Sequence, residues 1–363
     1  MNFICNKDLL VKKVSNASKA ILPKTIEGVL DSVYIEANEN SLTITGYNME
    51  FGITDNVKAD VITQGKMIVS AKIFLEIIKK MPGDKISVIM EDQKCVIRSE
   101  KTEYAIMSGN VEDYPELPQI GDMKEISVES GILKSMIGQT IFAVAIMDSK
   151  PVFTGALFDI NEGKINMVAT DGSRIAIRTE KIDTKDKFYF VVPGKALSEL
   201  EKLIEDNEEK IIIELGKEHV IFRLGEEVVI SRLLDGDFLS YRQCIPAEWS
   251  TDINISTKEL IDSIERTSLI IHDRIKNPIR MNFLNDKITI SCSTALGKSY
   301  DEIDCTANGK EIEIGFNSRF VLDVLRASQS ENVVVKLRGS TSPMCIVPEE
   351  GDKFLFLVLP TRL

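Results

Sequence analysis

The chain has 363 residues, of which 44% are hydrophobic and 28% are charged, and its formal net charge is −12. This composition is typical of a globular protein with a packed core, and it excludes disordered and collagen-like chains. The length exceeds what one hydrophobic core usually supports, so we expect two or three domains. The negative net charge, if it were spread evenly, would argue against nucleic acid as a partner.

The sequence has no feature of a membrane protein or a metalloprotein. Lys7 and Asp8 interrupt the N-terminal segment before an apolar run could form, so no signal peptide is expected. The most apolar stretch, residues 141–147, is far shorter than the roughly 20 residues that span a bilayer. The six cysteines contain no C-x-x-C pair and only two histidines are present, which favours buried free thiols over zinc ligands. We therefore expect a cytoplasmic protein with no cofactor, no metal site and no membrane association.

The first third of the chain reads, in order, as helix, strands, helix and strands. Residues 7–21 have the apolar spacing of a helix, and the alternating stretch at 42–53 predicts two strands joined by a turn. Residues 70–81 predict a second amphipathic helix, and residues 85–100 predict two closing strands.

The same order of elements recurs twice more. The alternating strand patterns that begin at residues 42, 165 and 288 are spaced 123 residues apart, which indicates repeated structural units. The second copy has helices at 130–146 and 193–204 and strands at 165–176 and 210–225, and the third has helices at 257–271 and 317–328 and strands at 288–299. We therefore predict an α+β fold of three similar domains, 1–125, 126–249 and 250–363.

The middle copy contains the strongest turn signal, Asp171-Gly172 between alternating hydrophobic residues. The other copies have Asn48 and Thr294 at the position of Asp171, so this turn chemistry belongs to the middle copy alone. The domain needs a hairpin here, but it does not need these side chains.

One alternative is a hydrolase with paired acid and base groups. It would use Asp171 with Arg174, or Asp235 with Asp237. Asp235 and Asp237 flank a glycine and have no evident histidine or lysine partner, so turn chemistry explains them better.

Three local motifs occur in order along the repeat: ATDGSRIAI at 169–177, LLDGDFLSYRQCIP at 233–246 and FLVLPTRL at 356–363. With the repeat, they closely resemble the bacterial sliding clamp family, the beta subunit of the DNA polymerase III holoenzyme, over the whole chain. The resemblance implies the DNA clamp fold, with two helices and antiparallel sheets in each domain, and a ring-shaped head-to-tail homodimer. It implies a non-catalytic processivity factor that encircles double-stranded DNA without sequence preference. The implied partners are DNA polymerase, clamp-loader subunits and repair proteins, which bind through short peptide motifs.

A ring of six such domains has room for DNA. Domains of this size are roughly 35 Å across and would enclose a hole about one domain wide, whereas duplex DNA is roughly 20 Å across. An acidic protein can thread DNA if basic side chains face this hole. Basic residues recur at matching helix positions in the three copies, and others match basic positions that the family uses near DNA. The predicted DNA-facing residues are Lys24, Lys72, Lys79, Lys150, Lys195, Lys202, Arg319 and Arg326.

Alternatively, these basic residues simply lie on solvent-exposed helix faces, where they form i,i+4 ion pairs with acidic residues of the same helix. A further alternative for the whole chain is a repeat-built protein scaffold unrelated to DNA.

The resemblance also implies a hydrophobic groove that binds client peptides. It is formed by the turn in the motif at 169–177, the connector at 233–246 and the tail at 356–363. Leu239-Ser240 stands where the family usually has Pro-Asp, and Ser173 and Thr361 also depart from it, so the peptide preference stays open. Alternatively, residues 356–360 are simply the last strand. The matching positions are Thr170, Gly172, Ser173, Arg174, Ile175, Leu239, Gln243, Cys244, Pro343, Val358, Leu359, Pro360, Thr361 and Arg362.

The family's apolar dimer contact matches positions in the first and third domains. The alternative for each of them is an ordinary core residue. Lys72 could pair with Asp301 or Glu302 across this contact. The predicted dimer residues are Tyr104, Ile106, Ile270 and Ile271.

Overall fold

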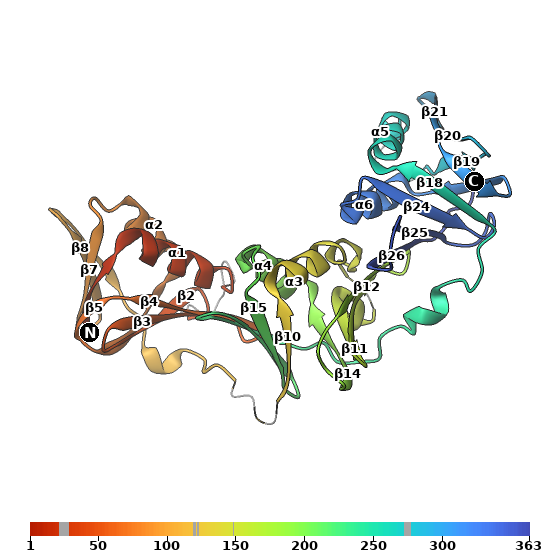
Figure 1. Cartoon of the computed structure of the whole chain (residues 1–363). Helices are drawn as coiled ribbons and strands as arrows, with labels where there is room; N and C mark the ends of the chain where they lie inside the picture. The colour runs from red at the N-terminus through yellow and green to blue at the C-terminus, as the bar shows by residue number, and fades with distance from the viewer. Residues whose placement is uncertain (22–28, 119–120, 122, 148, 272–276) are drawn as a thin grey trace. The chain divides into compact units, whose positions relative to one another are not determined.

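The structure is a computed structural model that describes residues 1–21, 29–118, 121, 123–147, 149–271 and 277–363. The chain divides into two compact units (Figure 1). Unit 1 comprises Met1–Ser130 and Lys202–Leu233, and unit 2 comprises Gly131–Glu201 and Leu234–Leu363. Each unit thus combines one end of the chain with part of its middle third. The domain boundaries expected near residues 125 and 249 stay predictions.

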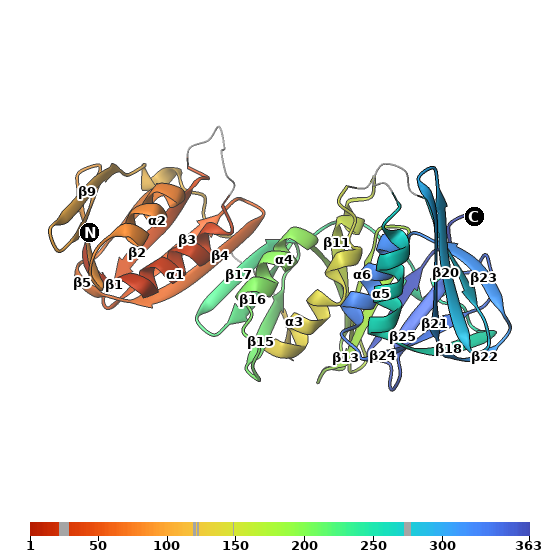
Figure 2. The ribbon, with the colours of Figure 1, turned by 90° about the horizontal axis from the view of Figure 1, so that it is seen from above.

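Unit 1 is built from two antiparallel sheets and two α-helices within the described residues. The helices are α1 (Lys7–Ser18) and α2 (Ala71–Lys80), and the strands are β1 (Asn2–Asn6), β2 (Ser32–Asn38), β3 (Ser41–Tyr47), β4 (Phe51–Lys58), β5 (Asp60–Thr63), β6 (Gly65–Ser70), β7 (Lys85–Glu91), β8 (Lys94–Ser99), β9 (Thr102–Met107), β10 (Lys124–Glu129), β15 (Lys210–Leu215), β16 (His219–Leu224) and β17 (Glu227–Arg232). One sheet has the order β5-β1-β7-β8-β9 and the other β10-β15-β16-β17-β4-β3-β2-β6. Figures 1 and 2 show α1 and α2 side by side, and α1 packs against β3 and β4.

Unit 2 contains the other two described sheets. Its helices, which lie in it wholly or for the most part, are α3 (Ser130–Gly138), α4 (Gly194–Leu203), α5 (Thr257–Ser268) and α6 (Ser318–Ser328). Its strands are β11 (Gly155–Asn161), β12 (Lys164–Thr170), β13 (Arg174–Lys181), β14 (Lys187–Pro193), β18 (Thr251–Ser256), β19 (Ile279–Phe283), β20 (Lys287–Thr294), β21 (Gly297–Asp304), β22 (Thr306–Gly309), β23 (Ile312–Phe316), β24 (Asn332–Leu337), β25 (Met344–Pro348) and β26 (Phe354–Val358). The sheet orders are β14-β11-β12-β13-β26-β25-β24-β18-β22 and β21-β20-β19-β23. As Figure 2 shows, α5 and α6 pack together.

The register of the hairpins repeats between the units. Tyr34 of β2 pairs with Thr45 of β3. In unit 2 the residues 123 positions later, Leu157 of β11 and Val168 of β12, pair in the same way. The internal repeat predicted from the sequence is therefore also present in the strand pairing, and the α+β prediction is confirmed.

The helices begin within one residue of the predicted positions, and three of them, α1, α3 and α5, end three or more residues early. Asn6 and Asn317 cap α1 and α6, because each side chain accepts a hydrogen bond from a backbone N–H of the first turn. A helix was predicted over 130–146, but α3 ends at Gly138. The Thr140 hydroxyl donates to the carbonyl of Met136 at 2.7 Å, which satisfies one of the free carbonyls at this helix end.

Strand pairing between β17 and β4 joins distant parts of the chain into one sheet. Next to this pairing, Asp55 is fully buried and accepts a hydrogen bond from Nζ of Lys13 at 2.6 Å. One carboxylate oxygen of Asp55 and one of Glu227 are buried without a hydrogen-bond partner among the described residues. Burial and the neighbouring Asp55 raise the pKa of Glu227 to about 7.

We expect Glu227→Gln to stabilise the protein at high pH and to have little effect at low pH. A carboxyl whose folded pKa exceeds its unfolded value contributes stability that is present at low pH and lost as the pH rises through the folded pKa. The free energy of unfolding should rise by about 1 to 2 kcal/mol near pH 8, since solvent screens part of the penalty, and by far less near pH 5. Urea unfolding at the two pH values measures this difference, with the exposed Glu208→Gln as control. An equal gain at both pH values would contradict the assignment.

Candidate functional site

The turn between β12 and β13 is held by its own side chains. Thr170 is buried, and its hydroxyl donates to the carbonyl of Arg174 at 2.7 Å. One carboxylate oxygen of Asp171 accepts from the backbone N–H groups of Ser173 and Arg174, at 2.9 and 3.1 Å. Gly172 has a φ of +82°, a conformation that favours glycine. Asp171 therefore builds the turn, as the turn interpretation of the sequence predicts.

The side chain of Arg174 connects this turn to α6. Its Nε donates to Asp171 at 3.0 Å and its Nη1 donates to Asp323 of α6 at 2.6 Å. Its Nη2 donates to the carbonyl of Phe142 at 2.7 Å, and the guanidinium lies 5.2 and 4.7 Å from the ring centroids of Phe142 and Phe320. The residue is only 8% exposed. Sequence reasoning assigned Arg174 to the border of a peptide slot and missed Phe142, Phe320 and Asp323, because these partners are distant in the chain.

Strand β26 brings the end of the chain beside the turn. It lies between β13 and β25, with Val358 opposite Arg174 on one side and opposite Met344 on the other. Pro343 directly precedes Met344 in the chain. The alternative that this segment is the last strand is therefore correct, and it is compatible with a tail that lies next to the turn.

The residues after β26 continue along the turn and then reach the second sheet of unit 2. The backbone N–H of Leu359 donates to the carbonyl of Ser173 at 2.9 Å. After Pro360, the N–H of Thr361 donates to the carbonyl of Gly315 at 2.8 Å. Leu359 is 46% exposed and Arg362 is also exposed, so the tail presents side chains to solvent beside the turn.

Apolar side chains of the connector cover the adjoining sheet face. Cys244 packs in the same hydrophobic cluster as Ile175 and Leu357. Phe238 joins this cluster and meets the ring of Phe153 edge to face, with the centroids 5.6 Å apart. Sequence reasoning missed the two phenylalanines. The signal for Phe238 was its place within the motif at 233–246, next to Leu239.

A hollow of about 380 Å³ lies beside the connector. It is lined by Leu239 and Gln243 from the predicted groove, together with Asp159 and Tyr189. The Tyr241 hydroxyl donates to Asp159 at 2.7 Å on its wall. The other predicted groove residues do not line this hollow. The structure therefore places Ile175 and Cys244 in one apolar cluster beside the turn and tail, and Leu239 and Gln243 line a hollow that shares Phe238 and Tyr241 with this cluster.

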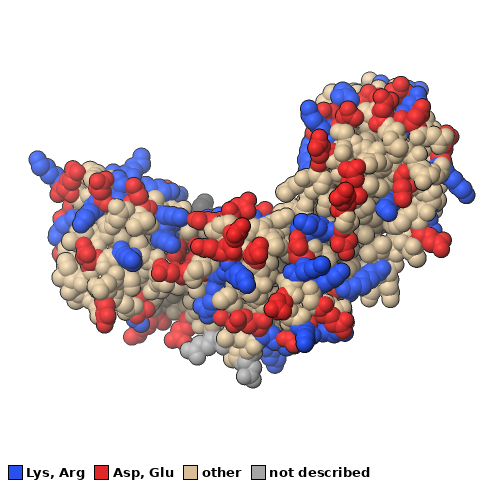
Figure 3. All heavy atoms as spheres, viewed as in Figure 1, with Lys and Arg blue, Asp and Glu red and all other residues tan. Residues whose placement is uncertain are grey.

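The predicted DNA-facing side chains are exposed wherever the structure describes them. The ammonium of Lys150 lies 5.8 Å from the ring centroid of Phe153. Lys24 lies outside the described residues. In Figure 3, basic and acidic side chains are interspersed on the visible face of each unit. Lys72 and Lys79 are on α2, Lys195 and Lys202 on α4, and Arg319 and Arg326 on α6.

The ion pairs of α6 differ from a simple i,i+4 row. Arg326 pairs with Glu265 of α5 at 2.6 Å. Asp323 lies between Arg319 and Arg326 on the same helix, but it pairs with Arg174 of β13 instead. The acidic residue in this helix thus has a structural partner outside the helix.

The predicted dimer residues lie on β9 in unit 1 and just after α5 in unit 2. Tyr104 and Ile106 are on β9, the edge strand of the five-stranded sheet, and Tyr104 is 46% exposed. Ile106 is partly buried against the core of unit 1. Ile270 and Ile271 follow α5 and are also partly buried.

Strand β21 is the edge of the four-stranded sheet in unit 2. Its two carboxylates that were predicted to pair with Lys72 already have partners in their own chain. Arg266 donates to Asp301 at 2.6 Å, and Lys287 donates to Glu302 at 3.2 Å.

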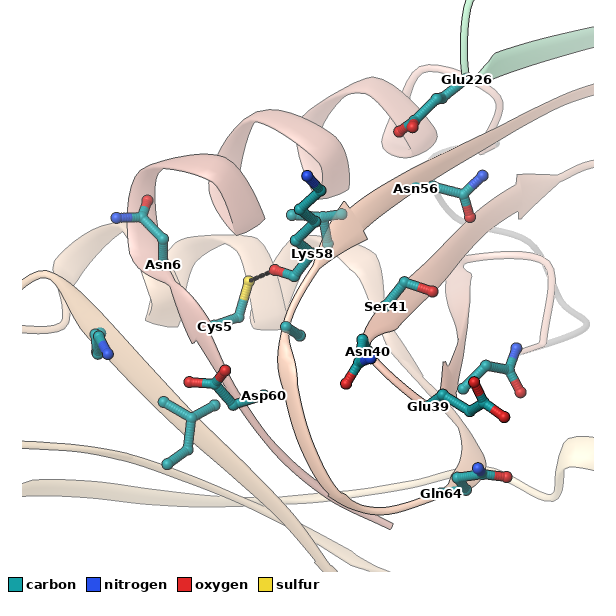
Figure 4. A pocket seen from close by; sticks show the side chains of 15 residues that line it. Cys5, Asn6, Glu39, Asn40, Ser41, Asn56, Lys58, Asp60, Gln64 and Glu226 are labelled. Atoms are coloured by element: carbon teal, nitrogen blue, oxygen red, sulfur yellow. Dashed lines mark hydrogen bonds between the residues drawn. The ribbon is translucent and has the colours of Figure 1, made fainter.

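The described residues contain no group of three or more His, Cys, Asp or Glu side chains that could hold a metal ion. Figure 4 shows a polar hollow of unit 1 in which the thiol of Cys5 donates to the carbonyl of Lys58 at 3.6 Å. Burial raises the pKa of Cys5 to about 11, so this thiol is a poor nucleophile. No helix in the described part of the chain is long and apolar enough to cross a membrane.

The chain matches the family models of three consecutive domains of the DNA polymerase III beta subunit. The N-terminal domain matches residues 1–118, the central domain 127–239 and the C-terminal domain 242–362. The beta sliding clamps of Halalkalibacterium halodurans and Bacillus subtilis are each 30% identical to it, over 378 and 376 aligned residues, and the alignments cover 100% of all chains.

Solved structures agree with these relatives. The DNA polymerase sliding clamp from Bacillus subtilis superposes with a TM-score of 0.97 at 29% identity, covering 100% of this chain and 99% of that chain. The DNA polymerase III subunit beta from Pseudomonas aeruginosa gives a TM-score of 0.96 at 26% identity, covering 100% of both chains. The resemblance found in the sequence is confirmed: the chain belongs to the bacterial beta sliding clamp family, the processivity factors of DNA polymerase III.

Proposed function

We propose that two copies of this chain close head to tail into a ring around double-stranded DNA and hold the replicative polymerase on it, without catalysis by the ring itself. The observation that carries this proposal is the match to beta sliding clamps over the full length in both sequence and fold. A ring keeps its DNA by topology, so its phosphate contacts can be loose and water-mediated. A protein with a negative net charge can therefore hold DNA. We expect it to do so in the cytoplasm.

Exposed basic residues on the helices support this arrangement. Lys72 and Lys79 of α2, and Lys195 of α4, are exposed side chains with long, flexible stems. Such side chains can contact phosphates of any sequence while the ring slides. Their role requires only that these helices line the hole.

Edge strands support closure by a second copy. β9 and β21 end their sheets, and an edge strand presents unpaired N–H and C=O groups that another strand can pair with. Exposed Tyr104 on β9 and Tyr300 on β21 add apolar area at these edges.

The apolar cluster that contains Ile175, Cys244 and Leu357 supports a client groove beside the turn and tail. Polymerase, clamp-loader and repair proteins would insert a short apolar-aromatic peptide there. Micromolar affinity, about 8 kcal/mol, would let such partners exchange. The hydrolase alternative that uses Asp171 has no support, because this carboxylate is used in the turn and by Arg174.

The first test is retention on DNA. Once loaded by the matching clamp loader onto nicked circular plasmid, the protein should co-elute with the plasmid in gel filtration and dissociate after the plasmid is linearised. Lys72→Glu/Lys79→Glu should reduce the loaded fraction several-fold, because it reverses charges that face phosphates. Lys181→Glu/Lys185→Glu makes the same charge change at the exposed end of β13 and in the loop that follows it, and should leave loading unchanged. Equal retention on linear and circular plasmid would contradict the ring.

The second test concerns the client groove. Leu239→Asp and Leu359→Asp change exposed side chains, so the fold should tolerate them. Each should weaken binding of a fluorescein-labelled peptide containing leucine and phenylalanine about tenfold, because a charge replaces apolar contact area. Met49→Asp is a matched control in the corresponding turn of the first copy and should have no effect. Fluorescence anisotropy measures the Kd, and an unchanged Kd in both groove variants would refute the location.

The third test concerns the Arg174 contacts. Arg174→Met should lower the free energy of unfolding by roughly 3 kcal/mol, because it leaves Asp323 without its ion-pair partner. The double variant Arg174→Met/Asp323→Leu should recover part of this loss, since the unpaired carboxylate is gone. Urea unfolding of the single and double variants measures the coupling. Additive losses would show that the two side chains do not depend on each other.

A further inference from the structure

A second groove lies in unit 1, on the sheet face that turns away from α1. Leu42 and Ile44 of β3 point to the core that α1 covers, so the alternate residues Thr43 and Thr45 point to the opposite face. There a groove of about 1380 Å³ runs between strands β2–β4 and residues 108–117, which directly follow β9.

The internal repeat identifies what is unusual about this face. The positions of Leu157 and Val168 in unit 2 correspond to Tyr34 and Thr45 in unit 1. In unit 2 these residues belong to the apolar cluster under the connector and are buried. In unit 1 Thr45 is also buried and its hydroxyl lies 3.1 Å from that of Thr54, whereas Tyr34 packs with Tyr114 and Leu117 and stays partly exposed.

Two tyrosines form the apolar wall of this groove. The rings of Tyr34 and Tyr114 are stacked with their centroids 5.5 Å apart. The Tyr114 hydroxyl donates to the carbonyl of Thr45 at 3.2 Å, which fixes its ring against the sheet. Tyr34 is partly exposed to the groove. A fixed aromatic face of this kind attracts a cation above it.

Most of the charged side chains that line the groove are acidic. Among the described residues that line the groove, Lys66 is the only Lys or Arg, whereas the acidic residues are Glu36, Asp92, Glu112 and Glu116. The ammonium of Lys66 already lies 6.0 Å from the ring centroid of Tyr34 and 3.6 Å from Glu36. Its side chain is 53% exposed, so solvent reaches this pair and an incoming group can replace it.

We propose that this groove binds a short basic segment of a partner protein, with an arginine or lysine over the Tyr34–Tyr114 wall and beside Glu36. Lys66 occupies this cation position when no partner is present. The acidic rim disfavours the phosphates of nucleic acid, so the occupant is a peptide. This site is separate from the apolar client groove and does not depend on it.

Fluorescence anisotropy with the full-length protein tests the proposal. The probe is a fluorescein-labelled peptide of alternating arginine and serine, and the matched peptide has glutamate in place of arginine. At about 0.15 M salt the basic peptide should bind and the acidic peptide should not. Glu36→Gln/Glu116→Gln should weaken binding about five- to tenfold, and Tyr34→Leu, which introduces the residue type of position 157, about threefold.

Two further variants separate a specific site from general attraction. Asp183→Asn/Asp186→Asn removes the same charge from an exposed loop of unit 2 and should leave the Kd unchanged. Lys66→Gln should tighten binding about threefold, because the resident cation no longer competes. Equal weakening by the loop variant, no effect of Lys66→Gln, or binding of the acidic peptide would overturn the proposal. Association beyond the proposed dimer instead of peptide binding, seen by sedimentation, would also overturn it.

Discussion

Backbone pairing between β13 and β26 is the interaction on which the site in unit 2 depends. It places Val358 opposite Arg174 and Leu357 opposite Ile175, although these residues are far apart in the chain. A slip of one residue would turn every side chain of β26 to the other face of the sheet. Leu357 would then leave the apolar cluster that it shares with Cys244. The register therefore fixes which residues the turn, tail and connector present together.

Elements governed by local chemistry could be predicted from the sequence. The helix at 317–328 was predicted to within one residue, because Asn317 supplies a cap and the apolar residues follow a helical period. The turn at Gly172 was also predicted, because few residues other than glycine adopt its φ. The joining of β17 to β4 could not be predicted, because edge strands of two repeat copies carry no local sequence signal for each other.

The candidate site in unit 2 likewise combines features that the sequence predicted with features that it could not predict. Sequence reasoning named Asp171 and Arg174 together, but only the structure shows that Arg174 binds Asp323 and stacks near Phe142. These contacts make Arg174 a support for the turn, since a buried guanidinium with charged partners holds both segments in place. The family resemblance predicted which residues border the groove. The interactions beneath it depend on side chains from separate elements.

The repeat also shows that the copies share their strand pairing but differ in the side chains at the paired positions. Tyr34 pairs with Thr45, and Leu157 with Val168, in the same register, so the strand pairing does not require either set of side chains. In unit 2 the apolar set is buried beneath the connector, which stabilises the sheet by removing apolar area from water. In unit 1 Thr45 is buried with its hydroxyl beside that of Thr54, and Tyr34 packs with Tyr114 and Leu117 while it stays partly exposed. The same strand pairing can therefore bury an aliphatic side chain in one copy and leave an aromatic side chain partly exposed in the other.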